Sequence, residues 1–261
     1  MQYVDGKLQR NLWVGKIGFN AMKQDELISS IYQMPTEKNC PYVVFTGVQI
    51  IVGAESSERI AAAQNEATIC AVDGMPIHWL AKRKKIESER CGGPDIMWRI
   101  LKEGVQRNYR HYFYGNTQKV LDTLRSKLME EIEGINIVGM YSPPFRELSK
   151  EEEAAVIRRI NEAKPDFVWV GLGAPKQDFW MQKYRNELVN TRLMGVGAAF
   201  NFLSGKISRA PVWMQKMGME WCYRMLIERG HLWKRYLIGA PKFIGIVIRD
   251  VRKERKRKRL S

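Results

Sequence analysis

The residues best suited to bind an anion lie in a strand-to-helix turn that reads Val-Gly-Leu-Gly-Ala-Pro-Lys-Gln. The apolar run Phe167–Val170 predicts a buried parallel strand, which Gly171 and Gly173 then break. Pro175 stands where a helix can begin, because its missing N–H costs nothing there, so Lys176 and Gln177 fall in the first turn. Backbone N–H groups, a cation and an amide at the carboxyl end of a strand can hold a phosphate. An ordinary strand-to-helix turn accounts for the same residues, and this segment alone leaves both interpretations open.

Asp73 is the acidic residue whose position best fits a catalytic role. It follows the apolar run Ile69–Val72 directly and opens the turn Asp-Gly-Met-Pro. A carboxylate at the end of a strand can act as a general base toward a hydroxyl group. The alternative is an aspartate that only forms the turn, bonded to neighbouring backbone N–H groups.

Other kinds of chemistry have little support in the sequence. The eight aspartates include no Asp-x-Asp pair, and the three histidines form no metal-binding set. We therefore expect no metal cofactor, and Lys/Arg side chains and helix N-termini would balance a bound diphosphate. The glycines at 171 and 173 form only part of a dinucleotide-binding fingerprint. The turn Gly-Gly-Pro-Asp ending at Asp95 is either a second ligand loop or a helix start capped by Asp95.

The elements that position these residues alternate between strands and helices. We expect strands at Tyr42–Thr46, Ile69–Val72, His111–Tyr114, Ile135–Val138, Phe167–Val170 and Leu193–Val196, and helices at about 118–131 and 149–163. This alternation predicts an α/β fold with a mostly parallel sheet covered by helices on both faces. Polar or glycine-rich residues follow nearly every strand. The carboxyl ends of parallel strands share one edge, so we expect a single binding site there.

Charge separates the end of the chain from the rest. Residues 206–261 hold 16 Lys/Arg and 4 Asp/Glu, a net charge of +12 out of +15 for the 261 residues. We predict an α/β domain over 1–205, a helical appendage over 206–248 and a basic tail over 249–261. A basic segment indicates a polyanionic partner, either a membrane surface or nucleic acid. A nucleic-acid-binding α/β protein is the alternative function, although no recognition helix or RNA-stacking motif is evident.

Composition points to a reducing compartment. Hydrophobic residues make up 45% of the chain, enough to bury a large core. The four cysteines are widely spaced, without a metal-ligand or Cys-x-x-Cys pattern. We expect no signal peptide, and the apolar stretch Leu237–Ile248 is far shorter than the ~20 residues that span a bilayer.

Eight segments in register resemble the bacterial WecG/TagA/CpsF glycosyltransferases (glycosyltransferase family 26). They are Thr46, residues 72–76 (Val-Asp-Gly-Met-Pro), 93–97 (Gly-Pro-Asp-Ile-Met), 114–116 (Tyr-Gly-Asn), 142–145 (Ser-Pro-Pro-Phe), 170–177 (Val-Gly-Leu-Gly-Ala-Pro-Lys-Gln), 195–200 (Gly-Val-Gly-Ala-Ala-Phe), and 209–213 (Arg-Ala-Pro-Val-Trp) with Glu220-Trp221. Three of them, Asp-Gly-Met-Pro, Gly-Pro-Asp and Ser-Pro-Pro-Phe, look most like the GumM-like glucosyltransferase branch.

The resemblance implies a Rossmann-like α/β domain of the GT-E type with a basic helical C-terminal appendage. It also implies an inverting, metal-independent transfer from a UDP-sugar, of the UDP-glucose or UDP-N-acetylmannosamine type. The acceptor would be a sugar on undecaprenyl diphosphate, in the synthesis of an extracellular polysaccharide or cell-wall polymer. Such an enzyme would lie on the cytoplasmic face of the membrane, docked through its appendage, and could form a homo-oligomer. No nucleic acid would be involved.

The family's functional positions carry over by motif. Asp73 matches the proposed base, Thr46 a threonine beside the site, and Gln177 a glutamine facing the donor sugar. The expected donor-binding residues are Gly115, Asn116, Gly173, Pro175, Lys176, Gly197 and Asn201. Arg224, Arg229 and Arg235 match the appendage arginines loosely and would stabilise the leaving diphosphate, although a solvated helix face explains them equally well.

Two positions depart from the family pattern. Val48 stands where many members have asparagine, and Asn201 where many have aspartate. These departures bear on the donor sugar more than on the reaction class. A side chain at 201 can still hydrogen-bond a ribose hydroxyl, but it carries no charge.

Overall fold

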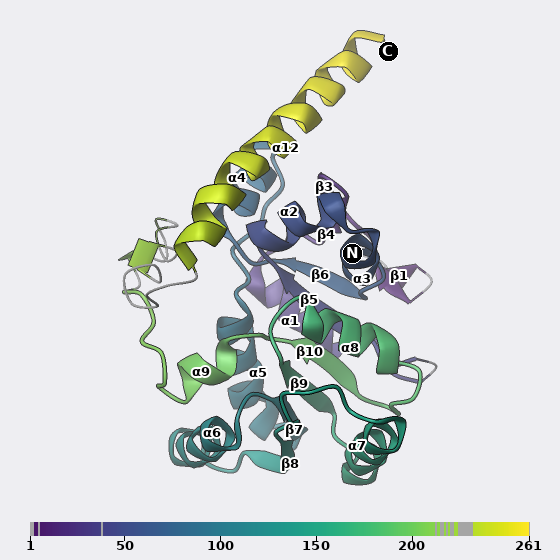
Figure 1. Ribbon diagram of the computed structural model, residues 1–261, viewed down its shortest axis with the longest axis vertical. Coiled ribbons are helices and arrows are strands. Elements are labelled where there is room, and N and C mark those ends of the chain that lie inside the picture. Colours follow the sequence, from purple (N-terminus) through teal and green to yellow (C-terminus); the bar gives the residue numbers. More distant parts are fainter. Residues whose placement is uncertain are drawn as a thin grey trace.

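The computed structural model describes residues 3–4, 6–37, 39–211 and 232–260, together with 213, 214, 217, 219, 222 and 223. A parallel sheet of six strands lies at its centre, in the order β6-β5-β10-β9-β7-β8 (Figure 1). The strands are β5 (Tyr42–Thr46), β6 (Ile69–Val72), β7 (Arg110–Gly115), β8 (Asn136–Tyr141), β9 (Phe167–Gly171) and β10 (Arg192–Gly195). The predicted α/β fold with a parallel sheet is confirmed.

Helices cover both faces of the sheet. The described helices are α1 (Gln24–Tyr32), α2 (Val48–Ser56), α3 (Glu58–Asn65), α4 (Met75–Arg83), α5 (Gly93–Val105), α6 (Gln118–Glu131), α7 (Lys150–Ala163), α8 (Lys176–Tyr184), α9 (Ala199–Leu203) and α12 (Leu232–Leu260). Two antiparallel pairs precede the sheet: β1 (Tyr3–Val4) with β2 (Lys7–Leu8), and β3 (Leu12–Val14) with β4 (Ile17–Phe19).

The alternation of side chains along each strand divides the core into two layers. Tyr42 and Val44 of β5 belong to the layer that holds the buried residues of α2, α3, α4, α7 and α8, whereas Val43 and Phe45 belong to the layer of α1, α5, α6 and α9. Both sides of every central strand are therefore apolar, as expected for a parallel sheet buried on its two faces.

The connections change direction at the carboxyl edge of the sheet. β7 and β10 are followed by α6 and α9 on one face, while β9, which lies between them, is followed by α8 on the other. The loop after β9 thus leaves in the opposite direction from its neighbours. Such a switch point is where open α/β sheets bind ligands.

Two helix starts illustrate local sequence control, one as predicted and one not. The helix expected at about 149–163 begins at Lys150, where Ser149 and Glu152 form a capping box. The turn ending at Asp95 begins a helix, which was one of its two interpretations, but Asp95 is not the cap. Gly92 is the N-cap of α5, and Asp95 lies within the first turn, where it pairs with arginine side chains.

The C-terminal helix α12 packs along α2 and then projects beyond the domain (Figure 1). Phe243 and Ile246 are its buried apolar contacts. Asp250 accepts a hydrogen bond from the Gly15 backbone at 2.7 Å, and Arg249 pairs with both carboxylate oxygens of Glu55. No described helix is long and apolar enough to cross a membrane.

Candidate active site

Asp73 lies at the carboxyl end of β6, against the end of β5. Its backbone N–H donates to the carbonyl of Thr46 at 3.1 Å. A Cβ on Gly47 would lie 3.0 Å from the carbonyl oxygen of Asp73, so the two loops pack backbone against backbone. The Asp73 side chain is partly exposed. The structure thus places a carboxylate at the carboxyl edge of the sheet.

Charged side chains surround the start of α5, next to Asp73. A Cβ on Gly92 would lie 3.5 Å from Oδ1 of Asp73 and 3.0 Å from Oδ2 of Asp95. Asp95 binds both terminal nitrogens of Arg209, at 2.5 and 2.6 Å, and Arg90 at 3.2 Å. Arg209, in the segment that follows α9, is therefore tied to the loop that faces the candidate base.

Thr46, unlike Asp73, is fully buried. Its hydroxyl donates to Oε1 of Gln64, and Nε2 of Gln64 donates to Oδ2 of Asp178 at 2.8 Å. Burial raises the pKa of Asp178 to about 7, against the smaller opposing effects of side-chain hydrogen bonds with Gln64 and Gln177. The three buried polar side chains form a chain that runs beneath the site.

Gln177 clamps the loops that follow β9 and β10. Its Oε1 accepts hydrogen bonds from the backbone N–H groups of Gly173 (3.2 Å) and Gly197 (2.9 Å). Its Nε2 donates to the carbonyl of Gly195 at 2.7 Å. The structure therefore places this amide beneath the loops, where it fixes their separation.

Asn116 and Asn201 meet across the end of β9. Nδ2 of Asn116 donates to Oδ1 of Asn201 at 3.0 Å, and Oδ1 of Asn116 accepts from the Thr117 backbone at 2.9 Å. Gly115 precedes this turn with a φ of +122°, and a Cβ there would lie 2.7 Å from the carbonyl carbon of Gly171. Only glycine allows so close an approach of the two strand ends.

The remaining predicted residues separate into two groups. Pro175 is the N-cap of α8 and Lys176 is exposed at its first turn, so both lie at the same edge as Asp73. Arg224 and Arg229 lie outside the described residues, as does the side chain of Arg235, whose backbone belongs to α12.

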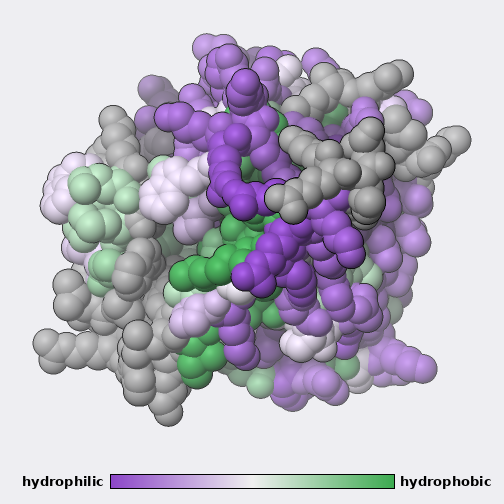
Figure 2. Space-filling model, turned by 90° about the horizontal axis from the view of Figure 1, so that it is seen from above, coloured by the Kyte–Doolittle hydropathy of each residue, from purple (hydrophilic) through white to green (hydrophobic). Residues whose placement is uncertain are grey.

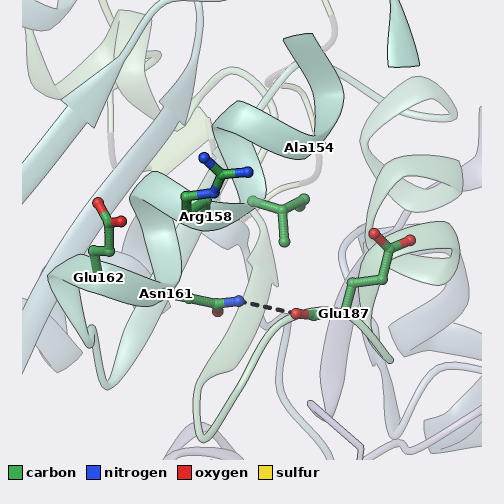
Figure 3. Close-up of a pocket in the computed structure, with 6 residues that line it drawn as sticks. Ala154, Arg158, Asn161, Glu162 and Glu187 are labelled. Atoms are coloured by element: carbon green, nitrogen blue, oxygen red, sulfur yellow. Dashed lines mark hydrogen bonds between the residues drawn. The ribbon is translucent and has the colours of Figure 1, made fainter. Parts of the chain in front are cut away.

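The hollow drawn in Figure 3 lies away from this edge. It has a volume of about 640 Å³ and is lined by Ala154, Ile157, Arg158, Asn161, Glu162 and Glu187. Asn161 and Glu187 come shortly before β9 and β10, so they lie near the amino ends of these strands. Among the described residues no group of His, Cys, Asp and Glu side chains could hold a metal ion.

Comparison with known proteins identifies the family. Residues 12–257 match the family described as "Glycosyl transferase WecG/TagA/CpsF family". The chain belongs to the WecG/TagA/CpsF glycosyltransferase family. This glycosyltransferase is 29% identical over 213 residues to the N-acetylglucosaminyldiphosphoundecaprenol N-acetyl-beta-D-mannosaminyltransferase of Bacillus spizizenii, covering 81% of this chain and 80% of that protein. It is 28% identical over 217 residues to the protein of the same name from Staphylococcus aureus, covering 83% and 81%.

Two buried polar residues of this WecG/TagA/CpsF member were not predicted from the sequence. Gln64 follows Ala61 by one helical turn on the buried side of α3, and Asp178 follows Gln177 in the first turn of α8. The helical spacing of Gln64 from Ala61 was the only signal that it points inward. Nothing in the sequence indicated that the two side chains bind each other.

Proposed function

We propose that this protein is an inverting, metal-independent glycosyltransferase with Asp73 as its general base. The donor is a UDP-sugar, and the acceptor is N-acetylglucosamine linked to undecaprenyl diphosphate, in the synthesis of a cell-wall or extracellular polymer. The observation that carries the proposal is the carboxylate of Asp73 at the carboxyl edge of the sheet, beside the charged cluster around Gly92.

In this reaction Asp73 accepts the proton of the acceptor hydroxyl as its oxygen attacks the anomeric carbon. The new carbon–oxygen bond forms opposite the bond that breaks, and UDP leaves with the electron pair of that bond. A positioned base contributes typically ~10²–10⁴-fold in rate. Thr46 and Gln177, being buried, would act by holding Asp73 and the donor loops in place.

The leaving diphosphate needs positive charge where no metal is used. Lys176 is exposed at the first turn of α8, beside the loops expected to hold the donor. Gly115, Asn116, Gly173, Pro175, Gly197 and Asn201 would contact the nucleotide, and Arg224, Arg229 and Arg235 would complete the charge from the appendage. Cations and amides aimed at the developing charge stabilise the transition state.

We take UDP-N-acetylmannosamine as the first donor to test, because both relatives described above carry that specificity in their names. UDP-glucose is the second. Val48 starts α2, two residues after Thr46, where it offers no hydrogen bond to a sugar. The donor pocket therefore differs from that of members with asparagine at this position.

Membrane docking through α12 would bring the site to a lipid-linked acceptor. Ile238, Ile244 and Ile248 are about half exposed on its outer side. Exposed basic residues follow, among them Arg252, Lys253, Arg255 and Lys256. Figure 2 looks down on this end of the molecule, where apolar side chains border strongly hydrophilic ones. Apolar and basic groups together suit an anionic lipid surface.

The deciding experiment measures UDP release from a panel of UDP-sugars in EDTA, with and without polyprenyl-diphosphate-linked N-acetylglucosamine. We expect acceptor-dependent release that EDTA does not reduce, and its loss in Asp73→Asn. Asp166→Asn is the matched control, because Asp166 lies at the amino end of β9, where asparagine can still accept the Arg110 N–H. Loss of activity in EDTA, or turnover by Asp73→Asn, would refute the corresponding part of the proposal.

A further inference from the structure

We propose that Gln64 and Asp178 are positioning residues that hold the catalytic base and the donor-binding loops at a fixed separation. They do so through the hydrogen bonds of Gln64 with Thr46 and Asp178, and the backbone joins these residues to the base at the end of β5 and to Gln177 after β9. This inference rests on the proposed function, because it assigns the two ends of the chain to the base and to the donor site.

The first half of the chain starts at Asp73. Its backbone N–H binds the carbonyl of Thr46, and the hydroxyl of Thr46 binds Gln64. The Sγ of Cys70 lies 3.3 Å from the same hydroxyl and can donate to it, which leaves the Thr46 proton directed at Gln64. The position of the base is thus linked to one side-chain amide in α3.

The second half reaches the donor loops. Nε2 of Gln64 binds Asp178, and Asp178 follows Gln177, the residue that clamps Gly173 and Gly197. A shift of Asp178 within α8 would move the clamp with it, since adjacent residues in a helix move together. Thr46, Gln64, Gln177 and Asp178 are each at most 2% exposed, so water does not compete for these bonds.

These buried hydrogen bonds are better suited to fixing the geometry of the site than to stabilising the fold. A carboxylate buried away from any cation costs free energy, and apolar residues of similar size often stabilise a core as well or better. Directed hydrogen bonds, by contrast, fix one geometry, and a misplacement of about 1 Å can cost ~10²-fold in rate. The function of this polar chain is therefore to set the distance across the site.

The test compares Gln64→Leu, which removes both bonds, with Thr68→Val. Thr68 is equally buried, and its hydroxyl accepts the Tyr42 N–H at the amino end of the same sheet. We expect Gln64→Leu to lower kcat at least ~10-fold with KM for the UDP-sugar changed less than ~3-fold. Thr68→Val should lose comparable stability and keep kcat within ~2-fold. The α3–α8 contacts of Gln182 with Glu66 and of Arg59 with Phe179 remain in both variants.

A second pair keeps the test valid if Gln64→Leu does not fold. Asp178→Asn retains an acceptor for Gln64 and should keep kcat within ~3-fold, whereas Asp178→Leu should lose activity as Gln64→Leu does. Unchanged kcat in Gln64→Leu or Asp178→Leu, or an equal kcat loss in Thr68→Val at matched stability, would overturn the proposal.

Hydrogen exchange separates this inference from the proposed reaction. The N–H groups of Gly173 and Gly197 are protected by Gln177, and their exchange can be followed without any substrate. We expect faster exchange of both in Gln64→Leu and not in Thr68→Val. That result would support the chain even if the wild-type protein transferred none of the sugars tested, and equal exchange in the two variants would refute it.

Discussion

Nδ2 of Asn116 donates a hydrogen bond to Oδ1 of Asn201, with the two atoms 3.0 Å apart. The bond joins the turn after β7 to the helix after β10 and so spans the end of β9, which lies between these strands. Both residues were assigned to the donor site from the sequence. Their contact shows that residues 85 positions apart in the chain meet at the carboxyl edge of the sheet.

Two substitutions of Asn201 should change the affinity for UDP in opposite directions. Asn201→Asp keeps the acceptor for Asn116 and adds the charge that many family members have, so a ribose hydroxyl would donate to a carboxylate. Charge-assisted hydrogen bonds are roughly twice as strong as neutral ones, and we expect UDP to bind about 3-fold more tightly by calorimetry. Asn201→Ala should weaken UDP binding about 3–10-fold.

A second asparagine pair supplies the control for this prediction. Asn136 donates to Asn108 at 3.3 Å, at the amino end of β8 and on the exposed surface. Asn136→Ala should leave the UDP dissociation constant unchanged. If Asn201→Ala also leaves it unchanged, the nucleotide does not lie beside Asn201.

Asp178 should make stability depend on pH. Burial raises its pKa from 3.8 to about 7 in the folded protein. Between these two values the folded state keeps a proton that the unfolded state releases. The contribution of Asp178 to the free energy of unfolding is therefore fully present below pH 4 and is lost as the pH rises to about 7. Tyr42 and Cys70, which interact with its charge, have pKa values raised by burial well above this range and stay neutral. Asp178→Asn should remove this slope.

Denaturant unfolding at pH 5, 6, 7 and 8 measures the effect. The free energy of unfolding of Asp178→Asn minus that of wild type should increase from pH 5 to pH 8, by an amount on the order of a few kcal/mol. The comparison uses the change with pH because an asparagine can alter stability at every pH through its own hydrogen bonds. Parallel curves for the two proteins would show that Asp178 does not titrate between pH 5 and 8.

Local patterns in the sequence predict much of this fold. The strands at Tyr42–Thr46 and Ile69–Val72 and the helix at 118–131 begin and end at the predicted residues. The strand expected at Ile135–Val138 runs instead over Asn136–Tyr141, because pairing with β7 extends it past Gly139. Strand order is set by packing between distant segments, which no local pattern records.

The candidate site was predicted less completely, for the same reason. The residues at strand ends, such as Asp73 and Asn116, could be found because turns follow apolar runs. The pairings of Gln64 with Asp178 and of Asp95 with Arg209 each join residues 114 positions apart in the chain. Residue type and spacing give no sign of such pairs.

The outer face of α12 should bind anionic vesicles. Ile244 and Ile248 are 56% and 46% exposed, one helical turn apart, while Phe243 and Ile246 face α2. The double substitution Ile244→Glu/Ile248→Glu should weaken binding to vesicles rich in anionic lipid at least ~10-fold in co-sedimentation, since it exchanges apolar burial for charge repulsion. Met129→Glu, at a similarly exposed position on α6, should have no effect.

The basic end of α12 can be tested by a truncation that the structure defines. Removal of residues 249–261 would also remove the contacts of Arg249 with Glu55, of Asp250 with Gly15 and of Glu254 with Lys84. Removal of 255–261 keeps those contacts and should weaken vesicle binding most at low salt, where charge attraction is least screened. Unchanged binding would mean that the residues before 255 are sufficient for docking.

The ion pair between Arg209 and Asp95 should couple far more strongly than pairs on the surface. Its two bonds are bidentate, and both side chains are less than one-third exposed. We expect a double-mutant cycle of Arg209→Met and Asp95→Asn, read by denaturant unfolding, to give a coupling energy of about 1–2 kcal/mol. The bidentate pair of Arg146 with Glu152 is the control, because its side chains are 59% and 40% exposed and should couple by only ~0.5 kcal/mol. Equal coupling in the two cycles would mean that burial adds nothing to the pair beside Gly92, and that the segment after α9 is held to α5 by other contacts.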